Sequence, residues 1–230
     1  MTLFENIPNR RAEGRWITAL VIGTLGVVGI GSYYFLGARD LGWIDVTMLF
    51  VMVSFAALGT MRTILGGILT GLAGYLATGL AASFYPVLTP YSRSFLNILG
   101  TVGLGEAPAG PGLSSARLDY PALALSFAAL TVVLWIILEL LFRASFEDTH
   151  LALLGPMDQV GGAVIYLAVG VLVAALLFST IGYGLAGHPV YDEASLRPEL
   201  NRVLELHYRG QSFWFAGRPP AIYVYDLDLS

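Results

Sequence analysis

The sequence predicts an all-α membrane protein of five transmembrane helices, with a tight helical hairpin and a short extramembrane C-terminal tail. Of the 230 residues, 56% are hydrophobic and only 12% are charged. Soluble domains carry about 25% charged residues, so this composition is typical of membrane proteins. There are also five apolar runs long enough, at about 1.5 Å per residue, to cross a hydrocarbon layer of about 30 Å. The spans are expected at residues 16–38, 43–59 (the shortest), 62–85, 119–142 and 160–185.

The first span follows a polar N-terminal segment, residues 1–15, that contains several arginines. A basic start before an apolar run is also typical of a signal peptide. The run from Trp16 to about Ala38 is longer than an ordinary signal peptide core, however, and it has no convincing small-x-small cleavage site. The sequence therefore predicts an uncleaved anchor helix.

The second and third spans form the hairpin, residues 43–85, and only Thr60, Met61 and Arg62 separate them. So short a connection predicts two antiparallel helices that are direct neighbours. The third span carries Gly67, Gly71 and Gly74 on a flat face. Small-residue faces let helices approach closely, which predicts packing against other helices. The fifth span offers a similar pair, Gly170 and Ala174.

Residues 86–118 are expected to form a long loop, because they contain several prolines and a Gly/Pro-rich stretch. The part from Ser94 to Leu104 is apolar enough to lie at the membrane interface, or to dip into the membrane, as a short helix. Asp119 is expected to cap the fourth span, with Pro121 in its first turn.

Residues 16–185 are expected to form the transmembrane domain, and the tail, residues 186–230, is expected to lie outside the membrane. A short helix is predicted after Pro198, because Leu200, Val203, Leu204 and His207 fall on one face. Trp43 and the aromatic residues of the tail are expected to anchor at the interface. Those tail anchors are Phe213, Trp214 and Phe215. Residues 222–225 suggest a short strand or an extended segment.

The distribution of arginine predicts a cytoplasmic N-terminus and an extracytoplasmic tail. In that orientation the cytoplasmic side receives Arg10, Arg11, Arg15, Arg62 and Arg143. The opposite side receives Arg39, Arg93, Arg117 and the tail arginines. The bias is small, and it would place the long loop and the tail on the same face.

Glu139 is the one carboxylate well inside an apolar run, and such residues often mark ion or proton paths. Arg143 lies four residues later on the same helical face, in the favourable order for an ion pair. The favoured interpretation is therefore a structural pair that snorkels towards the interface. Asp45 and Asp158 begin the second and fifth spans, where a carboxylate offsets the helix dipole and satisfies free amides.

Other chemistry finds little support in the sequence. The chain has no cysteine, and its three histidines lie outside the predicted spans. No nucleotide-binding loop, hydrolase elbow or metalloprotease motif is present, and the few basic residues do not suggest nucleic-acid binding. We therefore expect no catalytic site, no cofactor and no metal, and we expect the partners to be lipids and membrane proteins.

Several segments resemble the colicin V production protein (CvpA) family of bacterial inner-membrane proteins. They are Trp43-Ile44-Asp45 at the start of a helix, the turn at residues 59–62, Phe84-Tyr85-Pro86 and the stretch from Leu154 to Ala163. The resemblance covers roughly residues 42–185, as four spans. The first helix and the aromatic tail are additions to it, and the turn carries fewer charges than is usual in the family. The resemblance implies a role linked to bacteriocin export and envelope physiology, and the family offers no established catalytic residues to carry over.

The sequence leaves three functions open. The first is a non-catalytic inner-membrane protein that acts through partner proteins in envelope maintenance or export. The second is an accessory subunit of a larger membrane complex, such as a respiratory or photosynthetic assembly. The third is a small transporter or channel component that uses Glu139, although transporters usually show broken helices or paired repeats.

Overall fold

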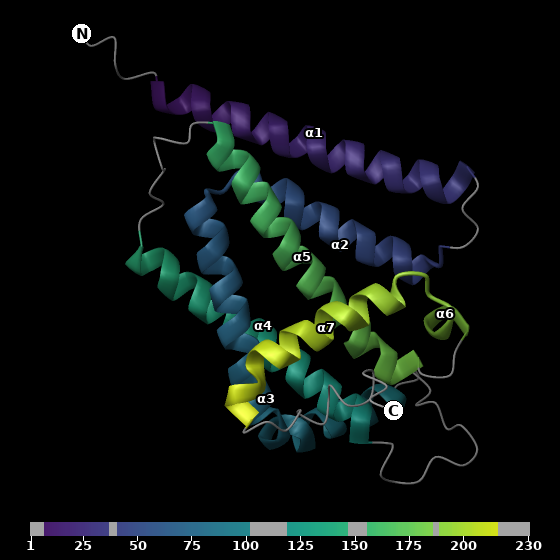
Figure 1. Cartoon of the computed structure of the whole chain (residues 1–230). Helices are drawn as coiled ribbons and strands as arrows, with labels where there is room; N and C mark the ends of the chain where they lie inside the picture. The colour runs from purple at the N-terminus through teal and green to yellow at the C-terminus, as the bar shows by residue number, and fades with distance from the viewer. Residues whose placement is uncertain (1–6, 37–40, 102–118, 147–155, 186–188, 216–230) are drawn as a thin grey trace.

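The computed structural model describes residues 7–36, 41–101, 119–146, 156–185 and 189–215. These residues form helices and contain no strand. Five long helices make up the bundle, and two short helices and a 3₁₀ turn, η1, follow them (Figure 1). The long helices are α1 (Ile7–Leu36), α2 (Trp43–Gly59), α3 (Ile64–Thr101), α4 (Asp119–Ser145) and α5 (Pro156–Leu185). The short ones are α6 (Pro189–Asp192), α7 (Arg197–Gln211) and η1 (Ser212–Phe215).

The fold is an all-α membrane protein, as the sequence predicts. Four helices are long and apolar enough to cross a membrane, at Arg15–Leu36, Ile64–Leu96, Ala122–Ser145 and Met157–Gly182. The fifth apolar helix, α2, has 17 residues, which is about 26 Å at 1.5 Å per residue and is near the lower limit for a span.

The prediction that the hairpin helices are direct neighbours is wrong. From the turn at residues 60–63, α2 and α3 diverge, and α5 packs against both of them (Figure 1). The other main contacts join α3 to α4 and α1 to α2. A short connection fixes where the second helix starts but not its direction, so the packing of α5 decides the angle.

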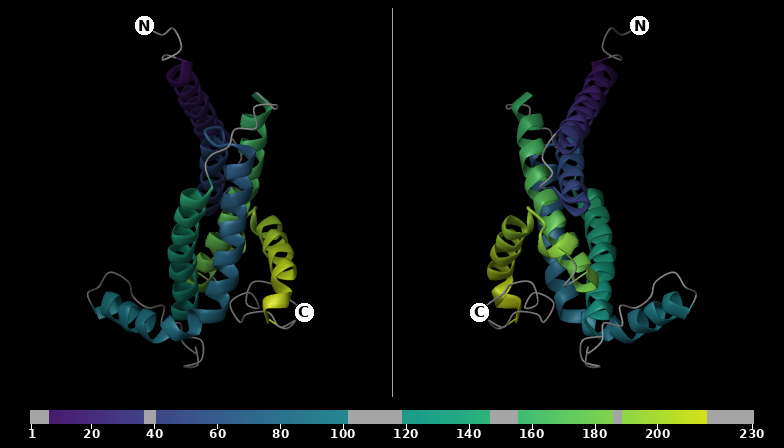
Figure 2. Two further views of the ribbon diagram at one scale, coloured as in Figure 1. Left: turned by 90° about the vertical axis from the view of Figure 1, so that its left-hand side faces the viewer. Right: turned by 90° about the vertical axis from the view of Figure 1, so that its right-hand side faces the viewer.

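The prediction of a loop from residue 86 is also wrong for its first half. Residues 86–101 continue α3 as a helix through Pro86 and Pro90, and residues 102–118 lie outside the described part. We call residues 86–101 the arm. Figure 2 shows the arm running sideways from the foot of α3. Proline removes a backbone donor and bends a helix. The Thr89 and Ser94 hydroxyls donate to backbone carbonyls four residues earlier, and hydrogen bonds of this kind favour the same bend.

The predicted tail helix is present as α7, and it packs against α5. Its buried face includes Leu200 and Leu204, and Leu200 joins a cluster with Ile44 of α2 and Phe178 of α5. The residues suggested as a strand, 222–225, lie outside the described part. The first part of the tail is therefore a component of the folded bundle.

Candidate functional site

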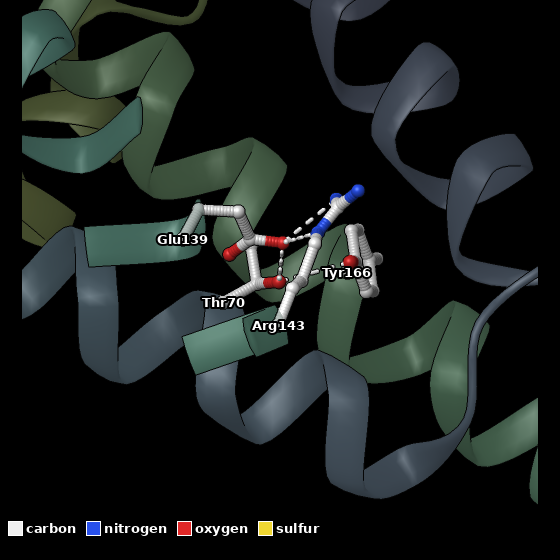
Figure 3. Close-up of polar contacts among 4 residues, drawn as sticks. All are labelled: Thr70, Glu139, Arg143 and Tyr166. Carbon is white, nitrogen blue, oxygen red and sulfur yellow. Dashed lines mark hydrogen bonds and ion pairs between the residues drawn. The ribbon is translucent and has the colours of Figure 1, made fainter. Parts of the chain in front are cut away.

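A polar cluster lies between α3, α4 and α5, close to the end of the bundle that carries the α2–α3 turn. Its members are Thr70, Glu139, Arg143 and Tyr166 (Figure 3). Arg143 donates to Glu139 Oε1 from Nε at 3.0 Å and from Nη2 at 2.8 Å. The Thr70 hydroxyl donates to the same oxygen at 3.1 Å and lies 2.9 Å from the Tyr166 hydroxyl.

The hydrogens in this cluster can be placed from the donors that are available. The Thr70 hydroxyl has one proton, which it donates to Glu139, so the Tyr166 hydroxyl donates to the Thr70 oxygen. The chain of donors therefore runs from Tyr166 through Thr70 and ends on Glu139 Oε1. Glu139 Oε2 is buried and has no hydrogen-bond partner among the described residues.

The surroundings of the cluster determine what it can do. The Glu139 side chain is 19% exposed, whereas Arg143 is 50% exposed and extends towards the end of α4. Arg143 balances the charge of Glu139, and the hydroxyls join α4 to α3 and α5. The arrangement stabilises a carboxylate inside an apolar bundle, and it also forms a continuous line of groups able to exchange protons.

Asp158 connects α5 to the α2–α3 turn. Its side chain is 3% exposed, and Oδ1 accepts a hydrogen bond of 3.0 Å from the Ile64 amide at the start of α3. The sequence suggested that Asp158 acts on its own helix, but this bond satisfies a free amide of a different helix. Gly59 and Gly162 allow the close approach, because a Cβ at Gly162 would lie 2.7 Å from the Gly59 carbonyl oxygen.

Asp45 makes the corresponding connection at the opposite end of the bundle. It is fully buried, and Oδ2 accepts hydrogen bonds from the Gly42 amide at 2.9 Å and from the Ser195 amide at 3.1 Å. Oδ1 accepts from the Leu196 amide at 2.9 Å. The first bond is the helix capping that the sequence suggests, and the other two fix the start of α7 against α2.

The glycines singled out in the sequence contact other helices of this chain. A Cβ at Gly67 would lie 3.0 Å from Ile165, and one at Gly71 would lie 3.5 Å from Val169, so both face α5. Gly74 faces Trp135 of α4, and Gly170 faces Phe55 of α2. Ala174 is fully buried beside α2. These faces are therefore filled within the chain.

The aromatic residues predicted as anchors have different environments. Trp43 is 53% exposed and Phe213 is 68% exposed. The Trp214 ring covers Gly79 of α3, where an added Cβ would lie 3.2 Å from the indole. The Phe215 side chain lies outside the described part.

The family comparison concerns most of this bundle. Residues 44–203, more than half of the chain, match the family described as Colicin V production protein. The chain belongs to this family. No curated protein and no solved structure matches the sequence. Membership of the Colicin V production protein family identifies a membrane protein involved in colicin V production and envelope function.

Helix α1, the second half of α7 and η1 lie outside the region matched by the Colicin V production family. Helix α1 precedes the match, and the match ends at residue 203, inside α7. It extends beyond α5, where the resemblance noted from the sequence stops. The Glu139 cluster and both buried aspartates lie within the matched region.

The second half of α7, beyond the family match, forms a polar contact with α3 that sequence reasoning missed. His207 Nε2 lies 3.0 Å from the Thr78 hydroxyl, and Gln211 Nε2 donates to the Thr78 hydroxyl and, at 2.8 Å, to the Tyr75 carbonyl. Burial lowers the pKa of His207 from 6.5 to about 4. The available signal was a histidine and a glutamine at helical spacing on the same face as Leu200 and Leu204.

No group of three metal-binding side chains (His, Cys, Asp or Glu) occurs among the described residues. Within this part of the chain, the Glu139 cluster is the strongest candidate for chemistry, and the exposed surface of α1 is the strongest candidate for binding.

Proposed function

We propose that this chain is a non-catalytic protein of the bacterial inner membrane that packs against partner membrane proteins in envelope maintenance or export. The observation that carries the proposal is the exposure of α1. In the most apolar stretch of α1, only 6% of the residues are buried, compared with 44% in the corresponding stretch of α3 and 39% in that of α5. Helix α1 also lies outside the family match, so it is an addition to the shared bundle.

The contacts of α1 leave a large apolar surface free for a partner helix. Helix α1 approaches α2 at Gly23, which faces Ala57, and at Gly26, which faces Val53. Further along, a Cβ at Gly29 or Gly31 would meet no atom of the described structure within 4 Å. Glycine in a helix interior costs about 1 kcal/mol relative to alanine, and in membranes it permits close helix packing. Gly29 and Gly31 therefore suit contact with another helix.

The buried carboxylates support a non-catalytic role. Asp45 and Asp158 are engaged by backbone amides, and Glu139 is engaged by Arg143 and Thr70. The Asp45 and Asp158 bonds and the Thr70–Glu139 bond connect different elements of the bundle, and the Glu139–Arg143 pair lies within α4. We therefore assign the three carboxylates to the architecture of the bundle and place the function on its outer surface.

The test is co-purification in mild detergent after leucine substitution on α1. Gly29→Leu and Gly31→Leu add bulk where the fold is open, so we expect loss of stoichiometric partners with little change in thermal stability. Gly26→Leu is the matched control for the fold, because its added side chain meets Val53 and should lower thermal stability. Unchanged partner recovery with both Gly29→Leu and Gly31→Leu would contradict the proposal, as would recovery of the chain alone from native membranes.

A second candidate function is transport of protons or another cation, favoured by the continuous chain from Tyr166 through Thr70 to Glu139. In proteoliposomes, Glu139→Gln would abolish the flux if this carboxylate carries the ion. Under the principal proposal, reconstituted protein shows no flux that depends on Glu139, while partner co-purification persists in Glu139→Gln.

A further inference from the structure

The arm of α3 carries a stripe of apolar residues that are largely exposed. The stripe consists of Val87, Tyr91, Phe95 and Ile98, whose spacings of four, four and three residues place them on one face of a helix. Their exposed fractions are 68%, 73%, 52% and 60%. Phe84, on the spanning part of α3, is 56% exposed and continues the same stripe towards the bundle.

The other faces of the arm have different roles. Arg93 is exposed, and its position in the helix is about 160° from the centre of the stripe, counting about 100° per residue. The base of the arm is held by α4, where the Ser126 hydroxyl donates to Ser92 at 2.8 Å. Tyr85 is buried against the Phe127 ring, with 6.2 Å between ring centroids. The contact with α4 therefore fixes the arm and leaves the residues of the stripe more than half exposed.

The direction of the arm identifies the environment that the stripe faces. Figure 2 shows the arm running sideways from the spanning part of α3, at the level where α4 begins. When the spanning helices cross a bilayer, a helix in this position lies along its surface. A helix with an apolar face, aromatic residues and a cation on the opposite face is typical of helices that lie in the membrane interface.

We propose that the arm is an in-plane membrane helix, with its stripe among the upper acyl chains of one leaflet and Arg93 among the phosphate headgroups. The occupant of the apolar face is phospholipid, because the stripe continues through Phe84 onto the surface that α3 presents to the membrane. The leaflet is the one next to α6 and α7, at the end of the bundle opposite the α2–α3 turn. This interaction is independent of any partner of α1.

The chain has no cysteine, so each introduced cysteine is the sole labelling site. Tyr91→Cys and Arg93→Cys, labelled with an environment-sensitive fluorophore, form a matched pair only two residues apart. Each is reconstituted in vesicles of phosphatidylethanolamine and phosphatidylglycerol. We expect the Tyr91→Cys probe to be quenched by lipids brominated in the acyl chains and shielded from aqueous iodide, and the Arg93→Cys probe to show the reverse.

Equal access of iodide to both positions would overturn the proposal. Dilution of the protein into more lipid distinguishes the two possible occupants of the stripe, lipid and a second copy of the chain. Quenching at the Tyr91→Cys position that is independent of dilution supports lipid, and shielding that disappears on dilution overturns the proposal in favour of a second copy. Thermal stability of the labelled variants, unchanged from the parent chain, shows that the bundle is intact. Because this assay involves no partner protein, its failure is distinguishable from failure of the function proposed for α1.

Discussion

Asp45, Asp158 and Glu139 show how this chain places carboxylates inside an apolar bundle. Burial of a charge is unfavourable unless donors surround it. Asp45 and Asp158 use backbone amides that helix ends leave free, and Glu139 uses Arg143 and Thr70. In each case at least one donor belongs to a different element, so the stabilised charge also fixes the position of that element.

Asp45→Asn should weaken the attachment of α7 to the bundle. Asp45 accepts amide hydrogen bonds on both carboxylate oxygens, so either orientation of an asparagine side chain would place an NH₂ group against an N–H donor. We expect a loss of about 2 kcal/mol, within the range for hydrogen bonds to a charged group. The measurement is thermal unfolding in detergent together with hydrogen exchange of the α7 amides. Glu199→Gln is the control, because Glu199 is exposed on the same helix, and an equal effect of both changes would refute this role of Asp45.

Gly162→Ala should be among the most disruptive conservative changes in the bundle. The added methyl group would lie 2.6 Å from the Arg62 carbonyl oxygen and 2.7 Å from the Gly59 carbonyl oxygen. Both contacts are with backbone, so α5 must move away from the turn, and overpacking of this kind costs about 1–3 kcal/mol. Gly71→Ala is the matched control, since its nearest contact would be an ordinary 3.5 Å from Val169. Equal melting temperatures for the two variants would contradict the predicted role of Gly162.

At the scale of elements, sequence periodicity predicted the helices better than their arrangement. The expected bounds of α2 match the structure, and α5 begins four residues earlier than expected. The angle between α2 and α3 could not be predicted, because it depends on contacts of Gly59 with Gly162, which is distant in sequence. The continuation of α3 through Pro86 and Pro90 was not predicted, because prolines normally end a helix, whereas packing of Tyr85 on Phe127 supports it. The short helix expected from Ser94 is present as the outer half of the arm, up to Thr101.

The candidate site was predictable only where its residues are close in sequence. The pair of Glu139 and Arg143 follows from a spacing of four residues on one helix. Thr70 and Tyr166 are 69 and 27 positions from Glu139, and neither belongs to a motif, so their approach depends on the tertiary fold. The contact between His207 and Thr78 was missed for the same reason, because it spans 129 positions.

The attachment of α7 should weaken as the pH falls below about 6.5. Burial lowers the pKa of His207 from 6.5 to about 4 when α7 is attached. Between these pH values His207 binds a proton more tightly when α7 is detached than when it is attached. The stability that neutral His207 contributes to the attachment of α7 is therefore complete above pH 6.5 and is lost as the pH falls towards 4. Hydrogen exchange of the α7 amides between pH 7 and pH 5, corrected for intrinsic rates, should report the change, because ordinary carboxylates titrate near pH 4.

His207→Gln is the control for this pH dependence. Glutamine keeps a hydrogen-bonding group near Thr78 but does not titrate, so protection of α7 should be constant over the same range. A variant that retains the full pH dependence would show that another group is responsible.

At the scale of the whole molecule, the path of the chain places the arm and α7 at one end of the bundle and the start of α1 at the other. The α2–α3 turn and the start of α5 lie near the beginning of α1, and α6 lies at the other end of the bundle (Figure 1). The arm and α7 therefore belong to the end opposite the N-terminus. Arg62 lies at the N-terminal end, and Arg93 lies on the arm. If the N-terminus is cytoplasmic, as the arginine distribution predicts, the arm and α7 are expected to be extracytoplasmic.

This orientation predicts opposite labelling of Ser145→Cys and Glu199→Cys by a membrane-impermeant thiol reagent. Both positions are exposed, one at the end of α4 and the other on α7, and the parent chain has no cysteine. In cells with a permeable outer barrier and an intact inner membrane, Glu199→Cys should react, and Ser145→Cys should react only after the inner membrane is opened. Ile136→Cys, exposed on the surface of α4 between its ends, is the control and should stay unreactive in both conditions. The reverse pattern would place the N-terminus outside, and equal labelling of both positions in intact membranes would mean that the small arginine bias does not fix one orientation.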